Sequence, residues 1–279
     1  MKPRGFTLVE LVMVIMITGI IAASVTVFLK PAIDSYVDTR RRGELTDMAD
    51  TAVRRISQDI RSAVPNSVRW VSASCIQLVP TIAGGRYRMA PDTTVATSKW
   101  IDSSTTTTDF DVLSPMAVTP TADATNGDWV VIDNQDGGEV YSNPDPGPRA
   151  RITGFSASAT GAHRITVAAK QFPIGYDGGR FVVVRNTETT IYYSCTGGTL
   201  YRGTTSNFAT VDAAACNAAT GAAIVATGVN CATDRTFFVY STNQGATQQS
   251  GFVWMRIELG DSAGESVALA HGIHVDNVP

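Results

Sequence analysis

The feature that most constrains this chain is an uncharged, apolar segment close to the amino terminus, at residues 11–29. As a helix rising about 1.5 Å per residue, it is long enough to cross the roughly 30 Å core of a bilayer. A secretory signal peptide is the alternative, because residues 20–24 offer a weak small-residue cleavage site. Glu10 argues against it, since a carboxylate in hydrocarbon costs roughly 2.5–3.5 kcal/mol and marks a functional group with a partner. We therefore expect a single-pass membrane helix.

A short motif before this segment carries a family resemblance. Residues 5–10 read Gly-Phe-Thr-Leu-Val-Glu. With the apolar run, they resemble the signal of type IV pilins and of the pseudopilins of type II secretion. The resemblance implies that a prepilin peptidase removes residues 1–5 as a leader, cutting after Gly5, and methylates the amino group of Phe6. It also implies that Glu10 contacts the amino terminus of an adjacent subunit, because a carboxylate buried among helices needs a positive partner.

Charges on either side of the apolar segment predict its orientation. Lys2 and Arg4 hold the amino terminus in the cytoplasm under the positive-inside rule. Arginines 40–42 favour the opposite orientation, but a short stub before a first helix usually prevails. We therefore expect residues 6–29 to cross the inner membrane, with everything beyond them in the periplasm until the subunit enters a filament.

The helix is expected to continue as an amphipathic segment over residues 30–64. Apolar residues recur every three or four positions, which predicts one apolar helix face. Pro31 removes a backbone donor and is a place for a kink, Gly43 weakens the middle, and Pro65 closes the element. The stripe consists of Ile33, Val37, Leu45, Ala49, Ala52, Ile56, Ile60 and Ala63.

Residues 65–279 change to short β-rich runs separated by Gly, Pro, Asn and Asp, which predicts a β-rich extracytoplasmic head. The connections are too short for helices between the strands, so the sheet is expected to be mostly antiparallel, with a hairpin turn at residues 196–198. Residues 86–120 and 204–228 are poor in large apolar groups and are expected to be surface loops. The fold class is α+β, type IV pilin-like, with the long helix packed on the sheet. The expected strands are 67–71, 75–79, 129–132, 164–168, 180–184, 190–194, 200–202, 236–240, 252–259 and 266–275.

Four cysteines in an exported head favour disulfides over a metal site, and no Cys-x-x-Cys pair is present. Cys195 ends an expected strand, and Cys216 lies in the loop that follows. Closing that loop of about 20 residues restricts the unfolded chain by about 3 kcal/mol. We expect Cys195–Cys216, with Cys75–Cys231 as the second pair; Cys216–Cys231 is the alternative.

The residues offer little chemistry. Charged residues are 17% of the chain and the net charge is −3, so nothing points to nucleic acid. His271 and His274 would point to opposite faces of a strand, and residues 133–139 resemble a turn more than a calcium loop. No Gly-x-Ser-x-Gly elbow is present. We expect no enzyme activity, no metal and no cofactor. Most of the arginines at 40, 41, 42, 54, 55 and 61 are expected on a solvated helix face, with acidic surfaces of neighbouring subunits as the alternative.

Residues of the head point to one group within the pilin family. The size of the head suits a subunit present in few copies, and residues 128–132, 180–184, 192–195, 200–202 and 274–279 resemble the MshO minor pilins of mannose-sensitive haemagglutinin (MSHA) pili, which are related to J-type pseudopilins. The resemblance implies a subunit that primes or caps a pilus or pseudopilus. Its partners would be major and minor pilins or pseudopilins, the prepilin peptidase and an inner-membrane assembly platform. The alternative is a tip adhesin, whose Thr-rich loops and exposed aromatics such as Trp100 contact a cell surface or carbohydrate.

Overall fold

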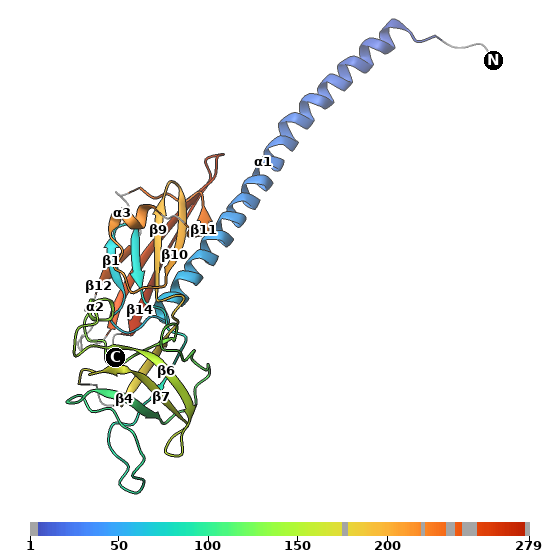
Figure 1. Ribbon diagram of the computed structural model, residues 1–279. Helices are drawn as coiled ribbons and strands as arrows, with labels where there is room; N and C mark the ends of the chain where they lie inside the picture. The colour runs from blue at the N-terminus through green and yellow to red at the C-terminus, as the bar shows by residue number, and fades with distance from the viewer. Residues whose placement is uncertain (1–4, 175–177, 219–220, 233–237, 242–249, 277–279) are drawn as a thin grey trace.

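The computed structural model describes residues 5–174, 178–218, 221–232, 238–241 and 250–276. Expectations that concern Lys2, Arg4, Thr236 and residues 277–279 lie outside these ranges. Within them, one long helix is followed by antiparallel strands in three sheets, with the helix packed on sheet (Figure 1). The expected α+β class is confirmed.

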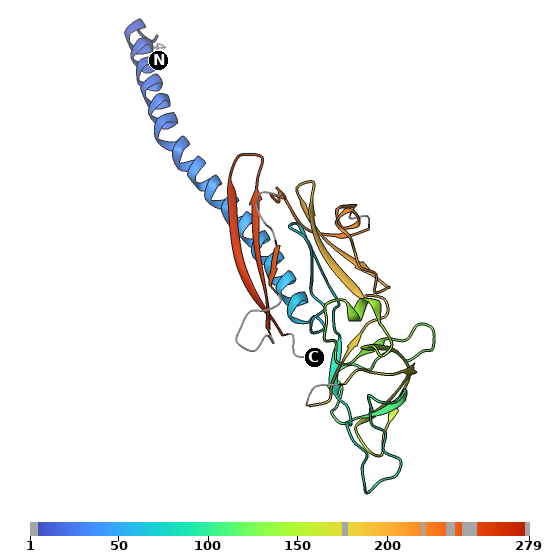
Figure 2. The same ribbon diagram turned by 90° about the vertical axis from the view of Figure 1, so that its left-hand side faces the viewer.

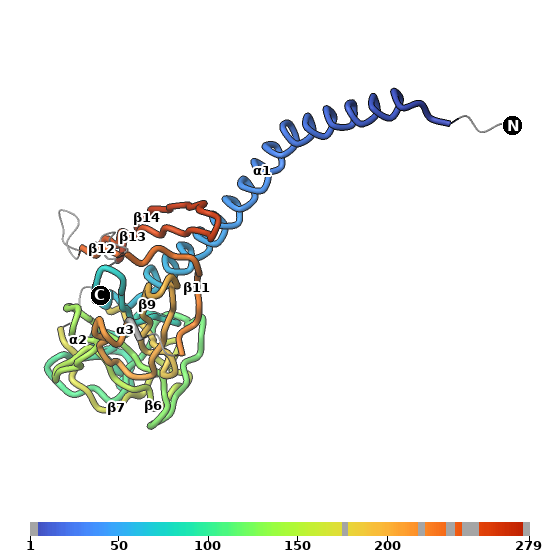
Figure 3. Tube along the Cα trace, turned by 90° about the horizontal axis from the view of Figure 1, so that it is seen from above, coloured from blue at the N-terminus to red at the C-terminus, as the bar shows by residue number. Residues whose placement is uncertain are grey.

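The helix α1 runs without interruption over Leu8–Arg61, against an expected 6–64. Pro31 lies inside it, and the helix curves smoothly in Figure 3. Its buried face begins only at Leu45 and includes Ala49, Ala52, Val53, Ile56, Ser57 and Ile60. Ile33 and Val37 share the predicted spacing but are 56% and 37% exposed, so the part of the stripe that they form does not pack on the head of this chain. The contact with the head begins at Leu45, about two turns after Val37.

Two sheets enclose the second half of α1 (Figures 2 and 3). Ile56 and Ile60 share one core with Tyr193 of the larger sheet and Met255 of the smaller. The larger sheet has the order β1 (Arg69–Ser72), β2 (Cys75–Leu78), β9 (Thr190–Thr196), β10 (Thr199–Thr205), β11 (Ala223–Thr227). The smaller has the order β12 (Phe238–Ser241), β13 (Ser250–Gly260), β14 (Ser266–Asp276). We call α1 from Leu45 and these two sheets the helix lobe.

The expected hairpin turn joins β9 to β10. Thr196 pairs with Thr199, which leaves Gly197 and Gly198 as a two-residue loop. Their φ angles are 56° and 78°, the left-handed region that such a turn requires at both positions and that glycine adopts without strain.

The third sheet closes into a small barrel. Its order is β3 (Ala83–Arg86), β8 (Arg180–Val184), β5 (Trp129–Val131), β6 (Arg149–Ala157), β7 (His163–Lys170), β4 (Thr107–Val112). A bridge between Tyr87 and Val112 joins the extension of β3 to β4, so the first strand meets the last. Phe110, Ile152, Ile165 and other apolar side chains fill the inside, as in barrels of this size. We call residues 81–188 the barrel lobe.

The barrel lobe is an insertion between two paired strands. Leu78 at the end of β2 pairs with Ile191 in β9, so the chain leaves and re-enters the helix lobe at one place. A small apolar core joins the lobes, and it combines Val64 and Val79 with Val131 and Tyr141 of the barrel lobe and with Phe208. The barrel lobe therefore extends the molecule beyond the carboxyl end of α1 (Figure 1).

Each of the ten expected strands corresponds to a strand of the structure, but β3, β4, β6 and β11 were not predicted. The expectation of surface loops is wrong where residues 86–120 form β4, and where residues 204–228 form the helix α3 (Ala213–Ala218) and β11. These segments lack long apolar runs. The barrel supplies a partner strand to β4, and β10 supplies one to β11, so pairing orders them without strong local propensity. A short helix, α2 (Glu139–Ser142), was not expected either.

All four cysteines form disulfides, but the expected pairings are wrong. The bonds join Cys75 to Cys216 and Cys195 to Cys231, and neither Cys195–Cys216, Cys75–Cys231 nor Cys216–Cys231 occurs. Cys75 pairs with Ser194 across the β2–β9 ladder, so Cys195 points to the opposite sheet face. Cys195 and Cys231 lie in the core beside α1, whereas Cys75 and Cys216 lie on the outer face.

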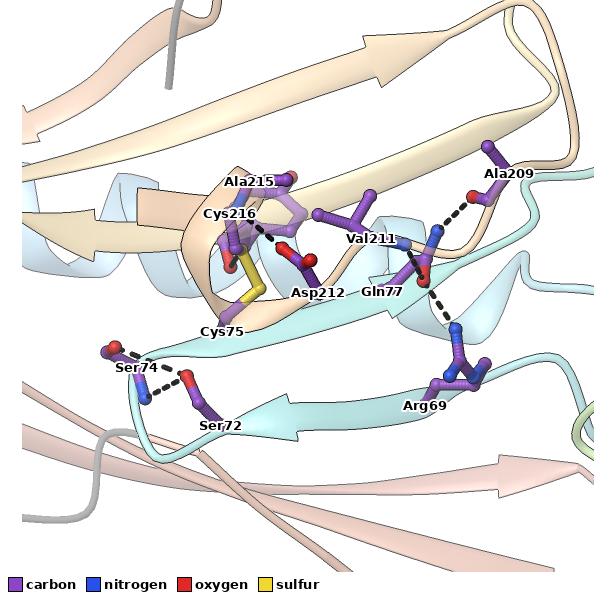
Figure 4. The surroundings of a disulfide bond; sticks show 11 residues. Arg69, Ser72, Ser74, Cys75, Gln77, Ala209, Val211, Asp212, Ala215 and Cys216 are labelled. Carbon is purple, nitrogen blue, oxygen red and sulfur yellow. Dashed lines mark hydrogen bonds between the residues drawn. A yellow bond between two sulfur atoms is a disulfide. The ribbon is translucent and has the colours of Figure 1, made fainter. Parts of the chain in front are cut away.

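The outer disulfide belongs to a larger attachment of residues 206–218 to β2 (Figure 4). Gln77 Nε2 donates to the Ala209 carbonyl at 2.8 Å, and Gln77 Oε1 accepts from Val211 N at 3.1 Å and Arg69 Nη1 at 2.8 Å. Asp212 Oδ1 accepts from Ala215 N at 2.7 Å at the start of α3. Polar contacts thus order a segment that has few large apolar groups.

Candidate functional site

The first half of α1 is an apolar surface without a partner in this chain. By length and composition, α1 is able to cross a membrane, and none of its most apolar window is buried against the rest of the chain. Leu8, Ile15, Ile20 and Phe28 are all more than 60% exposed. An apolar surface this long is stable only in lipid or against other apolar helices. This half of the helix is the candidate functional site.

Glu10 takes part in capping the amino-terminal end of α1. Its Oε2 accepts from the Thr7 backbone N–H at 3.0 Å and from Thr7 Oγ1 at 3.0 Å, while Glu10 N donates to Thr7 Oγ1 at 3.3 Å. This is a capping box, and the Thr-x-x-Glu spacing that marks one is visible in the sequence, although we did not use it. No ion pair to Glu10 forms within the described ranges, and its contact with a neighbouring amino terminus stays a prediction.

Gly5 and Phe6 lie before the helix and are exposed. A Cβ on Gly5 would have no atom within 4 Å, so the fold itself does not require glycine there. Phe6 is 87% exposed. The peptide bond between the two residues is therefore accessible to a peptidase.

The arginines of α1 mostly serve the chain itself. Arg42 Nε lies 2.6 Å from Glu265 Oε2, and Arg41 Nε lies 3.8 Å from Asp261 Oδ2, so both reach the β13–β14 turn. The hydrogen bond from Arg42 lowers the pKa of Glu265. Arg40 and Arg54 pair with carboxylates one turn away along the helix. Arg41 is half-buried and the other five arginines are exposed, as expected for a solvated helix face. The link that Arg41 and Arg42 make between the helix and the hairpin was not predicted.

A second link fixes the end of α1 to the larger sheet. Asp59 Oδ2 accepts from the Tyr193 hydroxyl at 2.6 Å and from Arg202 Nε at 2.8 Å. Arg202 Nη1 also lies 2.8 Å from Glu188 Oε1. Burial, together with the hydrogen bond to Asp59, raises the pKa of Tyr193. These contacts fix the orientation of the helix relative to the head. The two contacts of Asp59 join residues that are 134 and 143 positions apart, so the spacing of residues in the sequence does not predict them.

The candidate metal residues do not converge. His271 borders a cleft with Val53, Arg54 and Ser57 of α1, whereas His274 is exposed and contacts the Phe252 ring edge-to-face. In residues 133–139, Asp136 Oδ1 accepts from Gly138 N at 2.8 Å, and Glu139 Oε2 accepts from Gln135 N at 3.1 Å, as turn carboxylates do. The described residues contain no group of three or more His, Cys, Asp or Glu side chains placed to hold a metal ion.

Comparison with known protein families finds a match that falls on this candidate site. Residues 1–26 match the prokaryotic N-terminal methylation motif, the prepilin signal of type IV pilins. No curated protein sequence and no solved structure matches the chain. The motif implies processing by a prepilin peptidase and assembly with other pilins. It supports a type IV pilin-like or pseudopilin-like protein, and the exposed apolar helix is compatible with anchorage in a membrane.

Proposed function

We propose that this protein is a minor pilin or pseudopilin without enzymatic activity. Residues 6–29 cross the inner membrane, the head lies in the periplasm, and cleavage after Gly5 followed by methylation of Phe6 readies the subunit for a filament. The observation that carries the proposal is the apolar first half of α1, which has no partner in its own chain and bears the methylation motif. Packing such helices against one another buries this surface when the subunit leaves the lipid.

The shape of the head supports a place at the filament tip, where the subunit primes or caps assembly. The barrel lobe lies beyond the carboxyl end of α1, in the direction that points away from the membrane (Figures 1 and 2). In a filament of parallel helices, the head of a subunit added earlier would occupy that space. A subunit with this lobe therefore fits best at the filament tip, where no earlier subunit occupies that space. The filament would be an MSHA-like pilus or a type II secretion pseudopilus.

Mass spectrometry of the membrane-extracted protein tests the processing step. We expect a mature chain that begins with methylated Phe6, and an unprocessed chain for Gly5→Val, because the side chain blocks close approach of the peptidase. Gly19→Ala is the matched control, since a Cβ there also meets no atom within 4 Å. A wild-type amino terminus other than methylated Phe6 contradicts the proposal.

A tip adhesin is the second candidate function. It is favoured by the exposed Trp100, which belongs to the barrel lobe. Deletion of the protein separates the two roles: loss of filaments indicates priming, whereas normal filaments that no longer attach to surfaces indicate adhesion.

A further inference from the structure

Trp100 lines two neighbouring clefts of the barrel lobe. It lies in the connection from β3 to β4, in the lobe that is farthest from the amino terminus (Figure 1), and its side chain is 39% exposed. The first cleft, of about 230 Å³, contains the apolar side chains of Met89 and Ile174. The second, of about 500 Å³, is rich in hydroxyls from residues 105–108. Both clefts also contain Asp102.

The backbone on both sides of Trp100 is fixed. Lys99 N donates to Asp111 Oδ2 at 2.9 Å, and Lys99 O accepts from Asp111 N at 2.9 Å. On the other side, Ile101 N donates to the Arg88 carbonyl at 3.0 Å, and the Ile101 side chain is buried in the barrel core. Neighbouring side chains of an extended segment point in opposite directions, so the inward Ile101 directs Trp100 outward. The backbone that carries the indole is therefore fixed, which reduces the entropy lost when a ligand stacks on the ring.

Polar groups around the indole are suited to hydroxyls. Asp102 Oδ1 accepts from Ser104 N at 2.9 Å and from Ser104 Oγ at 2.7 Å, and these hydrogen bonds lower the pKa of Asp102, so that it is ionised at neutral pH. Within the described part of the chain, Asp102 Oδ2 accepts no hydrogen bond. Lys99 Nζ lies 3.6 Å from Asp109 Oδ1, which neutralises one further carboxylate.

We propose that Trp100 and its two clefts form a binding site for a neutral saccharide. The apolar face of a pyranose ring stacks on the indole, and its hydroxyls donate to Asp102 and exchange hydrogen bonds with the hydroxyls of residues 105–108. Sites for small ligands combine an apolar or aromatic wall with a few polar groups that fix orientation in this way. An acidic sugar is disfavoured, because the uncompensated Asp102 carboxylate borders both clefts. The inference rests on the adhesive role proposed above, but binding itself does not require processing or assembly.

The test is binding of the detergent-solubilised full chain to immobilised neutral and sialylated oligosaccharides, followed by calorimetric titration of the best neutral ligand. We expect retention by neutral glycans, and an affinity reduced about tenfold or more in Trp100→Ala, because the stacking surface is lost. Asp102→Asn weakens binding less, since an amide oxygen still accepts. Ile224→Ala is the matched control, because Ile224 is an exposed apolar residue of the helix lobe, away from both clefts.

Thermal unfolding of each variant shows that the head is folded when it is assayed. Three outcomes overturn the proposal: no neutral glycan retained by the wild type, equal affinity in folded Trp100→Ala, or a preference for sialylated over neutral glycans. The measurement is made equally well on unprocessed protein, so failure of methylation at Phe6 and failure of glycan binding are separate results.

Discussion

At the scale of single residues, Asp111 is a buried carboxylate that connects several segments of the barrel lobe. Its side chain is fully buried, and it accepts hydrogen bonds from Lys99 N, Ser158 Oγ, Thr160 Oγ1 and Arg164. These donors come from the β3–β4 connection and from the β6–β7 hairpin. One carboxylate therefore joins β4 to the β3–β4 connection and to the β6–β7 hairpin, and we call this junction the Asp111 seam.

The pH dependence of stability follows from this environment. Burial raises the pKa of Asp111, but the hydrogen bonds from Thr160, Lys99, Ser158 and Arg164 outweigh it and lower the pKa to about 2. Because this is below the unfolded value near 3.9, the stabilisation is complete above about pH 4 and is lost as pH falls towards 2. The shift corresponds to about 2–3 kcal/mol at neutral pH.

We therefore expect Asp111→Asn to lower the midpoint of thermal unfolding at pH 6 and to differ less from the wild type near pH 2.5. Asp47→Asn, which changes an exposed carboxylate of α1, is the control and should leave the midpoint unchanged. A pH-independent difference between Asp111→Asn and the wild type would show that the charge is not what stabilises the Asp111 seam.

Glu10 has two separable roles, because it caps its own helix and is expected to contact a neighbour. Glu10→Gln keeps a side chain that completes a capping box but removes the charge, whereas Glu10→Leu removes both. We expect both variants to insert in the membrane and both to enter filaments poorly, as measured by immunoblots of sheared filaments from a deletion strain. Val9→Leu is the control. Normal incorporation of Glu10→Gln alone would assign the defect of Glu10→Leu to the cap.

At the scale of elements, the sequence predicted the features that depend on the spacing of nearby residues. The spacing of Leu45, Ala49, Ile56 and Ile60 predicted the packed face of α1, since three- and four-residue spacing places side chains on one side of a helix. Ile33 has the same spacing but does not contact the sheets, because the spacing does not show where the sheets end. The apolar first half of α1 and the position of Glu10 near its start were also visible in the local sequence, whereas the link from Asp59 to Tyr193 depends on tertiary packing.

The Asp59 link gives an element-scale prediction. Asp59→Ala leaves the Tyr193 hydroxyl and the Arg202 guanidinium without their shared acceptor at a half-buried place, and we expect it to destabilise the helix lobe by about 2–3 kcal/mol. Urea unfolding of the detergent-solubilised protein measures this. Asp50→Ala, which removes the partner of the exposed Arg54, is the matched control and should have a much smaller effect. Equal effects of the two changes would refute the anchoring role.

The disulfide pairings give a second prediction at this scale. Non-reducing peptide mapping should recover Cys75 linked to Cys216 and Cys195 linked to Cys231. In the loop-entropy model, their separations of 141 and 36 residues restrict the unfolded chain by about 5 and about 4 kcal/mol. We expect Cys75→Ala/Cys216→Ala to lower stability more than Cys195→Ala/Cys231→Ala in the same urea assay. A linked Cys195–Cys216 peptide would contradict the packing of the helix lobe, in which Cys195 lies in the core beside α1 and Cys216 lies on the outer face of the sheet.

At the scale of the whole molecule, the helix lobe and the barrel lobe have separate cores joined by a small third one. No linker sequence separates the two lobes, because the chain passes directly from the end of β2 at Leu78 into the barrel lobe and returns directly to β9. Only the pairing of Leu78 with Ile191 shows that the intervening residues are an insertion. A register between positions that far apart is not encoded in any local pattern, and this is why one undivided head was expected.

The insertion makes the role of the barrel lobe testable by excision. Replacing residues 81–188 with a short Gly-Ser turn leaves β2 and β9 paired, and it leaves all four cysteines in the helix lobe. We expect this variant to be processed normally and to form both disulfides, with reduced thermal stability because Val64 and Val79 lose their apolar neighbours. With the space beyond the carboxyl end of α1 cleared, earlier subunits no longer collide with the head. Immunogold labelling should then show the variant along the filament, whereas the wild-type protein labels filament ends. Labelling of the ends alone by a correctly disulfide-bonded variant would mean that contacts of the helix lobe, rather than the bulk of the barrel lobe, set the position of this subunit.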